Sequence, residues 1–199
     1  MPIIRSFIAL PTSTEIQKRI ASVQSELRQT EADVKWDSQD KFHITLKFLG
    51  DMERSKLDQF SDVLENGIQA FNQFDIIFET VGAFPHPKNP RIVWIGIQPS
   101  QLLLDLQIKV EQWATESGFP QEEHRFHPHI TLGRVKGTRN IVRLTEATKT
   151  CTFEPLNTQC PEFLLIQSTL RPGGSIYTIL TSFPLRPEGI QTGEIHGRQ

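Results

Sequence analysis

The sequence predicts an α+β protein with two similar lobes that face each other across a central cleft. The tetrapeptide His-Ile-Thr-Leu occurs at residues 43–46 and again at 129–132. Each copy follows an earlier arginine at the same separation of 38 residues, from Arg5 to His43 and from Arg91 to His129. The predicted order strand, helix, His-x-Thr strand, helix, strand also occurs twice. We therefore expect a duplicated fold with a pseudo-two-fold axis, in which antiparallel or mixed sheets carry their helices on the outside.

The first repeat begins with an apolar run at residues 3–10, which predicts a strand. Thr12 and Glu15 fit a capping box, and apolar residues at positions 16, 20, 23 and 27 predict a helix that ends near Asp33. Residues 41–49 alternate between apolar and polar side chains, which predicts a half-buried strand that ends at Gly50-Asp51. A helix over 57–71, a strand over 74–81 and a proline-rich loop over 84–90 complete this repeat.

The second repeat follows the same order. Residues 91–97 predict a strand, a helix begins after Pro99-Ser100, residues 129–133 predict a strand, and a weaker helix covers 138–148. Strands over 162–169 and 175–183 flank a turn at 171–174. We expect one domain over 1–185, with lobe one at about 3–84, lobe two at about 90–183, and the final strands open to exchange between the lobes. Residues 186–199 are polar and without periodicity, which predicts a flexible tail.

The composition of the 199 residues is that of a globular protein, with 37% apolar and 22% charged residues. The net charge of -2 disfavours a protein that holds a long nucleic acid by its phosphates, but it allows a small phosphorylated ligand or a nucleic-acid end. No apolar segment reaches the ~18 residues that a membrane helix needs, and the first residues do not resemble a secretion signal. Cys151 and Cys160 form no C-x-x-C motif, so we expect free thiols and a cytoplasmic location.

The two His-x-Thr motifs place the same polar groups on the same face of two strands. In the first strand the apolar residues pack toward the helices, so His43 and Thr45 face the cleft. By the same rule His129 and Thr131 face it from the second strand. One neutral imidazole can then remove a proton, while the other, protonated, delivers one to a leaving oxygen. The threonine hydroxyls can donate hydrogen bonds to phosphoryl oxygens, so the arrangement suits phosphoryl chemistry without a metal.

A set of motifs runs along the chain at Arg5–Ala9, Phe42–Gly50, Gly82–Pro85, Pro90–Trp94, Pro128–Arg134, Ser168–Leu170, Gly173-Gly174 and Tyr177. This set resembles the two-histidine phosphoesterase superfamily, whose signature is a pair of H-x-[ST] motifs in a duplicated fold. Within that superfamily it is most similar to the RNA 2′,3′-cyclic phosphodiesterases, also called RNA 2′-5′ ligases. The resemblance covers residues 3–183, and the complete set is far more specific than either His-x-Thr motif alone.

The resemblance implies hydrolysis of a 2′,3′-cyclic phosphate to a 2′-phosphomonoester, without a metal or any other cofactor. His129 would be the general base that activates water, and His43 the general acid that protonates the departing 3′ oxygen. The reverse of a related step, which joins a 5′-hydroxyl to a cyclic phosphate, would give 2′-5′ ligation with the two histidines exchanging roles. The expected partners are RNA ends or nucleoside 2′,3′-cyclic phosphates.

Further basic residues lie near the motifs. In a straight strand the side chain of Arg134 would point to the core, but a twist or bulge at Gly133 would bring it into the cleft, where the resemblance implies a phosphate contact. Lys41 and Lys47 share the face of the first histidine, and they either give the cleft a weak basic field or lie on a solvated strand face. Arg91, at the start of its strand, either contacts phosphate or RNA or lies on the surface.

His127 precedes His129 by two residues on the same face, and it either contacts phosphate or base or is simply solvated. A metal site that includes His124 is the weaker alternative, because Pro128 interrupts the segment and no acidic ligands accompany it. A nucleobase also needs a surface on which to stack. The aromatic candidates for that contact are Phe7, Phe84, Phe126 and Tyr177.

Two alternative functions stay open at this point. One is a two-histidine phosphodiesterase that acts on another phosphoester, such as ADP-ribose cyclic phosphate or a 2′-5′ oligonucleotide, because one fold can host several substrates. The other is a non-catalytic nucleotide- or RNA-binding module, although such a module would not need two titrating histidines. We expect a monomer with no membrane association and no protein partner.

Overall fold

Residues 3–172 and 174–187, the part of the chain described by this computed structural model, form two antiparallel sheets. The first sheet has the order β3-β1-β8-β9, with β3 at His43–Glu53, β1 at Ile3–Pro11, β8 at Glu162–Arg171 and β9 at Gly174–Pro184. The second has the order β2-β6-β5-β4-β7, with β2 at Val34–Trp36, β6 at His129–Val135, β5 at Asn89–Ile97, β4 at Phe74–His86 and β7 at Leu156–Cys160. This confirms the predicted α+β fold class.

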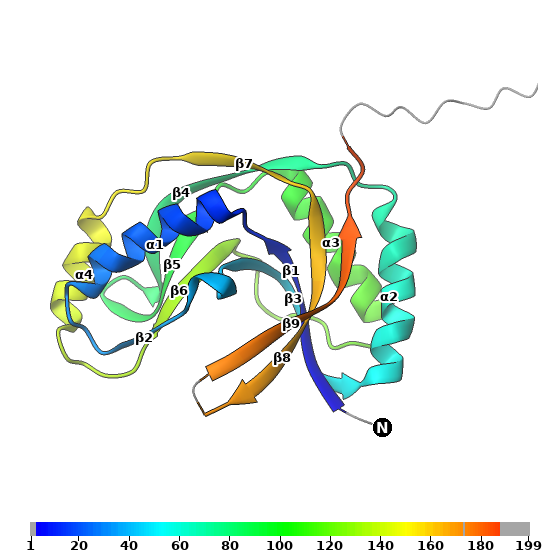
Figure 1. Ribbon diagram of the computed structural model, residues 1–199, viewed down its shortest axis with the longest axis horizontal. Coiled ribbons are helices and arrows are strands. Elements are labelled where there is room, and N and C mark those ends of the chain that lie inside the picture. Colours follow the sequence, from blue (N-terminus) through cyan, green and yellow to red (C-terminus); the bar gives the residue numbers. More distant parts are fainter. Residues whose placement is uncertain (1–2, 173, 188–199) are drawn as a thin grey trace, which may run out of the picture.

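In the described part of the chain four α-helices cover the sheets, at Thr14–Arg28 (α1), Arg54–Ile68 (α2), Gln101–Glu116 (α3) and Ile141–Thr150 (α4). Figure 1 shows α2 and α3 at one end of the molecule and α1 and α4 at the other, with the β8–β9 hairpin projecting between them. Helices α2 and α3 pack against β3, while α4 packs against β4 and β5. The apolar stripe of each helix joins one continuous buried cluster, so burial of these stripes holds the two sheets in place.

The first helix differs in detail from the prediction. Its amino-terminal cap is Ser13, whose hydroxyl accepts the N–H of Ile16, and not Thr12. The Thr12 hydroxyl instead donates to the carbonyl of Phe42 across 2.7 Å, which ties the start of α1 to the first motif strand. The helix ends at Arg28, before Asp33, and the short strand β2 that follows pairs with β6.

The strands of the two sheets do not follow the predicted lobe boundaries. Strand β4 falls mostly within the expected lobe one at 3–84, yet it belongs to the second sheet. Strands β8 and β9 belong to the first sheet, which is the exchange of the final strands that the prediction left open. The reason is that residues 84–90 are not a loop: Phe84 pairs with Ile92 and His86 with Asn89, so β4 and β5 form one hairpin. A hairpin keeps both of its strands in one sheet.

The predicted tail at 186–199 also begins differently. Arg186 forms a bridge with Asn72, and its carbonyl accepts the N–H of Gln73 at 2.7 Å. Its own N–H donates to the carbonyl of Phe71 at 3.0 Å. The chain is therefore paired up to this residue, and the rest of the predicted tail, 188–199, lies outside the described residues.

Strand β3 continues through Gly50, which has a φ of +77°, and it contains two irregularities of register. Ala9 pairs with Thr45 but Ile8 pairs with Lys47, so Leu46 is an extra residue on β3 and forms a β-bulge. The bulge reverses the alternation and turns Lys47 to the helix side, where it is 3% exposed. The prediction that Lys47 flanks the first histidine is therefore wrong.

Lys47 joins the first motif strand to the segment that leads into the second motif. Its ammonium group donates to Oε1 of Glu111 on α3 at 2.8 Å and to the carbonyl of Pro120 at 2.6 Å. The same carboxylate oxygen accepts the N–H of Glu122 at 2.8 Å. A buried ion pair of this kind costs desolvation on both sides, so the loss of one partner leaves an uncompensated charge.

Replacing Lys47 with methionine removes the positive charge, keeps the length of the side chain, and leaves the partly buried Glu111 carboxylate without a cation. We expect the free energy of unfolding, measured with urea, to fall by about 3–5 kcal/mol. Lys109→Met, on the exposed surface of α3, should change this free energy by less than about 0.5 kcal/mol. Equal stabilities for the two variants would contradict the buried pair.

Candidate active site

The two His-x-Thr motifs occupy matching places in the two sheets, on β3 and on β6. In both motifs the isoleucine and leucine are buried in the core, at 3% exposure or less, while the histidine and threonine are only half-buried. His43 and His129 are near enough that positive charge on His129 lowers the pKa of His43. The structure thus brings His43, Thr45, His129 and Thr131 to one site.

Each imidazole is held by a backbone carbonyl just before its own strand. Nδ1 of His43 lies 2.6 Å from the carbonyl oxygen of Lys41, and Nδ1 of His129 lies 2.7 Å from that of His127. A carbonyl oxygen only accepts hydrogen bonds, so Nδ1 is the protonated nitrogen in each ring. When the ring is neutral, Nε2 is therefore the free basic nitrogen.

Burial determines the charge of both rings. It lowers the pKa of His43 from 6.5 to about 4, against the opposing effect of the Lys41 carbonyl. Burial also lowers the pKa of His129; the His127 carbonyl opposes this shift, and positive charges at His127 and Arg134 add to it. Both histidines are therefore neutral at pH 7 in the unliganded protein, and both present a basic Nε2.

An aromatic cluster supports the first histidine. The ring centroid of Phe7 lies 4.9 Å from that of His43, and the ring of Tyr177 meets His43 edge-on at 5.4 Å. Phe7 is 3% exposed, so its ring supports the imidazole and has no open face for a nucleobase. Tyr177 is only half-buried and lines a cavity of about 250 Å³ together with His43.

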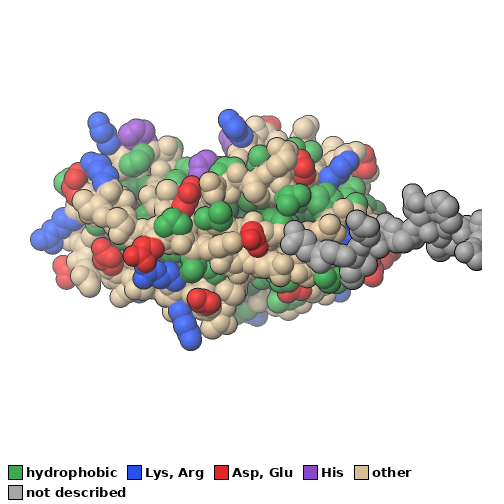
Figure 2. Space-filling view, turned by 90° about the horizontal axis from the view of Figure 1, so that it is seen from above, with side chains coloured by type: hydrophobic (Ala, Val, Ile, Leu, Met, Phe, Trp, Pro, Cys, Tyr) green, Lys and Arg blue, Asp and Glu red, His purple; other side chains and the backbone are tan. Residues whose placement is uncertain are grey.

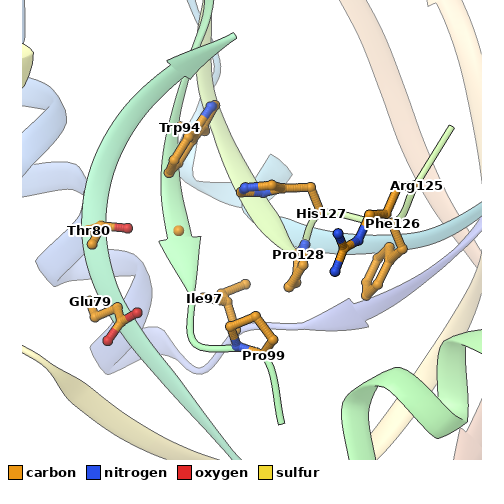
Figure 3. Close-up of a pocket in the computed structure, with 10 residues that line it drawn as sticks. Glu79, Thr80, Trp94, Ile97, Pro99, Arg125, Phe126, His127 and Pro128 are labelled. Carbon is orange, nitrogen blue, oxygen red and sulfur yellow. The ribbon is translucent and has the colours of Figure 1, made fainter. Parts of the chain in front are cut away.

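A second aromatic cluster surrounds His129. The ring of Phe84 meets His129 edge-on at 5.0 Å and His127 at 5.1 Å, and Trp94 lies 5.3 Å from His127. His127 and Trp94 line a cavity of about 370 Å³, which Phe126 also lines. Figure 3 shows the imidazole of His127 projecting toward Trp94, with Glu79 and Thr80 on the opposite wall. This cavity therefore offers open space directly beside the second motif.

Trp94 is the site residue that the sequence interpretation missed. Its indole lies over Gly82, the residue opposite it on β4, and over Gly96, two residues later on β5. A Cβ on either glycine would overlap the six-membered ring. The indole Nε1 is buried and has no partner among the described residues. A tryptophan on the cleft face of a strand, with glycine opposite it on the neighbouring strand and glycine two residues later on its own strand, is the signal that could have identified it.

Arg134 reaches the cleft face through a bulge that matches the one after the first motif. Val93 pairs with Gly133 but Trp94 pairs with Thr131, so Leu132 is the extra residue. Arg134 is exposed, and its charge lowers the pKa of His129 and opposes the rise in the pKa of Tyr177. Its guanidinium group is therefore near both sides of the cleft, as the expected bulge requires.

Two other predicted residues have different places. Arg91 lies exposed near the end of the hairpin, where the register shifts: Phe84 pairs with Ile92 but Pro85 pairs with Pro90, so Arg91 is an extra residue on β5. It lines none of the cavities described here. Lys41 does lie at the cleft, with its ammonium nitrogen 5.9 Å from the centroid of the Tyr177 ring.

Within residues 3–172 and 174–187, no group of three or more histidine, cysteine, aspartate or glutamate side chains is arranged to hold a metal ion. The helices of that part of the chain are also too short or too polar to cross a lipid bilayer.

The fold and the paired motifs define a two-histidine phosphoesterase. The profile of the LigT like Phosphoesterase family matches the chain twice, at residues 10–94 and 95–177, and the chain belongs to this family. The two matches are also the expected mark of a duplicated fold.

Relatives and solved structures agree with this assignment. The chain is 32% identical to the RNA 2′,3′-cyclic phosphodiesterase of Methanothermobacter thermautotrophicus, over 92% of this chain and 99% of that one. It is similar in structure to E. coli LigT complexed with 3′-AMP, with a TM-score of 0.74, 28% identity, and coverage of 92% of this chain and 99% of the other. The TT0787 protein of Thermus thermophilus shares the fold, with a TM-score of 0.79 at 24% identity over 93% of this chain and 100% of that one.

The lowered pKa of His43 predicts a specific loss of stability in acid. Between pH 6.5 and about 4 the unfolded chain binds a proton at this position and the folded chain does not, so the free energy of unfolding falls as the pH falls. His43 alone should contribute about 1.5 kcal/mol of this loss between pH 6.5 and 5. Urea unfolding of His43→Asn, which keeps a donor near the position of Nδ1, should show a correspondingly weaker dependence on pH.

His124→Asn, at an exposed histidine outside the cleft, is the matched control and should retain the pH dependence of the wild type. A His43→Asn variant as sensitive to acid as this control would contradict the buried, neutral imidazole.

Proposed function

We propose that this protein hydrolyses 2′,3′-cyclic phosphates at RNA ends or on nucleosides to 2′-phosphomonoesters. The observation that carries the proposal is the matched pair of imidazoles, each with Nδ1 bound to a backbone carbonyl and Nε2 left for chemistry. The family supports the reaction class, and the names of relatives such as the one from Methanothermobacter thermautotrophicus support the substrate.

In the proposed reaction, Nε2 of His129 takes a proton from a water molecule as its oxygen attacks the phosphorus. The bond from phosphorus to the 3′ oxygen breaks, and Nε2–H of His43 protonates that oxygen. The phosphate remains on the 2′ oxygen. Afterwards His129 carries the proton and His43 is neutral, and exchange with solvent restores the starting state.

The acid in this scheme must carry a proton although burial opposes charge at His43. A bound cyclic phosphate supplies the missing negative charge, because an anion beside an imidazole favours its protonated form. Substrate binding would therefore raise the pKa of His43 from its low value and charge the acid only when there is an oxygen to protonate.

The remaining cleft residues would hold the substrate. The hydroxyls of Thr45 and Thr131 have no hydrogen-bond partner among the described residues, so both are available to donate to non-bridging phosphoryl oxygens. Arg134 would add charge to the same phosphate. His127, together with Trp94 and Phe84, would enclose the base in the cavity beside the second motif.

Both motifs lie in one chain, so the proposed enzyme needs no second copy and acts as a monomer on RNA ends. Cys151 and Cys160 are free and buried, which suits a reducing cytoplasm. The same pair of histidines with exchanged roles would also join a 5′-hydroxyl to a cyclic phosphate, which gives 2′-5′ ligation as the reverse reaction.

Single substitutions of the histidines test the proposal directly. His43→Ala and His129→Ala should each lower kcat on a nucleoside 2′,3′-cyclic phosphate by ~10²–10⁴-fold, and the double variant should be little worse because the pair acts as a unit. The assay is run with EDTA, and the position of the phosphate in the product is determined. His86→Ala, in the β4–β5 hairpin, should have wild-type activity. Tight binding without turnover by the wild type would instead support a binding module.

The pH dependence should distinguish free enzyme from complex. Because both imidazoles have lowered pKa values, the bell-shaped profile of kcat/KM should have both limbs below the ordinary histidine value of 6.5. The profile of kcat should lie at higher pH, since the bound phosphate raises the pKa of the acid. Rates measured between about pH 4 and 9 check both statements, and a flat profile would remove the acid-base pair.

A further inference from the structure

A strongly basic pocket lies next to the cleft, and apart from Arg134 its cations have no role in the reaction proposed above. It has a volume of about 310 Å³, and its charged lining consists of Lys35, Lys41, Arg134, Lys136, Arg171 and a single acid, Asp37. We propose that this basic pocket binds the phosphodiester groups of an RNA strand immediately upstream of its cyclic phosphate, so that oligonucleotides are better substrates than nucleoside cyclic phosphates. The inference rests on the proposed function and names the preferred length of its substrate.

The cations of the basic pocket converge from separate segments of the chain. A Cβ placed on Gly174, at the start of β9, would lie 3.4 Å from Nζ of Lys35 and 3.6 Å from Nζ of Lys41. The two ammonium nitrogens are therefore at most about 7 Å apart, although one residue belongs to β2 and the other to the 3-10 turn at Gln39–Lys41. Like charges at such a separation repel each other, and an anion between them removes the repulsion.

In residues 3–172 and 174–187, these charges are not neutralised by ion pairs. None of the five cations takes part in an ion pair among the residues that the structure describes. Asp37 is the only carboxylate among the described residues of the lining, and burial raises its pKa even though Arg134, Lys41 and Lys35 act in the opposite direction. The basic pocket therefore carries a clear excess of positive charge that suits a ligand with several negative charges.

This excess is local. The chain has a net charge of -2, and on the face shown in Figure 2 acidic and basic side chains are interspersed. The pocket, with five cations and one acid, is thus much more positively charged than the protein as a whole. Such local clusters are the electrostatic signature of phosphate recognition.

The place of the basic pocket indicates which phosphates it would hold. Arg134 follows the second motif on β6 and lines the basic pocket, while Tyr177 lines it and also contacts the ring of His43. A strand whose terminal phosphate lies between the histidines would therefore pass Arg134 and place its next phosphodiesters among Lys35, Lys136 and Arg171. A nucleoside cyclic phosphate has no such groups and would leave those three cations unused.

Binding is tested first, without turnover. The probe is a 5′-labelled tetraribonucleotide with a 3′-hydroxyl end, and its Kd is measured by fluorescence anisotropy at several salt concentrations. The variant combines Lys35→Ala, Lys136→Ala and Arg171→Ala, three exposed side chains whose loss should not disturb folding. We expect its Kd to be at least ~10-fold weaker, and the slope of log Kd against log salt to decrease by about 0.7 for each cation removed.

The control variant removes three exposed lysines from the outer helices, Lys18→Ala, Lys109→Ala and Lys149→Ala, and so changes the net charge equally. Its Kd should stay within about twofold of the wild-type value. An equal loss in both variants would mean that only the overall charge matters, and no loss in the basic-pocket variant would mean that RNA lies elsewhere. Either result overturns the proposal.

Turnover separates the basic pocket from the proposed reaction. The wild type should have a kcat/KM at least ~10-fold higher for a tetranucleotide that ends in a cyclic phosphate than for a nucleoside cyclic phosphate. The basic-pocket variant should lose this preference while its kcat/KM on the nucleoside substrate stays within about twofold. If the wild type hydrolyses both substrates equally, the basic pocket is refuted and the reaction stands. If it hydrolyses neither but the basic-pocket variant still loses RNA binding, the reaction is refuted and the basic pocket stands.

Discussion

The hydrogen bond from Nδ1 of each histidine to the carbonyl two residues earlier is the interaction on which the chemistry of the site depends. It fixes the tautomer, because a carbonyl can only accept, and it leaves Nε2 as the reactive nitrogen of both His43 and His129. Burial keeps the rings neutral by lowering their pKa values. The aromatic rings of Phe7 and Phe84 then support the imidazoles from the sheet, so that two rings held by the same local geometry share one cleft.

A β-bulge lies at the end of both motifs, but different side chains follow it, so the two halves of the site are unequal. A bulge at the leucine of each tetrapeptide reverses the strand alternation three residues after the histidine. After the first motif it turns Lys47 inward to its ion pair with Glu111. After the second motif Gly133 takes the inward place, and the next residue, Arg134, reaches the cleft and the basic pocket. A duplicated backbone can in this way give one half a structural contact and the other half a binding group.

Much of this architecture could be predicted from the sequence, because alternation along a strand is a strong signal. The faces of both His-x-Thr motifs followed from it directly. The bulge after the first motif could not be predicted in this way, since nothing in the local pattern marks the extra residue, and Lys47 was therefore placed on the wrong face. The equal spacing that identified the repeat also concealed a difference in strand register. Leu10 pairs with Ile44, 34 residues later, whereas Ile95 pairs with Ile130, 35 residues later. The chain between the paired strands is therefore one residue longer in the second repeat. Strand β2 is too short to show a period at all, and it forms only because β6 offers it an edge.

The most direct test of this account is the protonation of the two imidazoles, observed by NMR through the ¹H–¹⁵N couplings of the rings at pH 7. We expect His43 and His129 to be neutral in the free protein, with the proton on Nδ1, and one ring to become doubly protonated when a nucleoside 2′-phosphate binds. Two rings that carry the proton on Nε2, or that stay unchanged when the nucleotide occupies the site, would contradict the acid-base pair on which the proposed reaction rests.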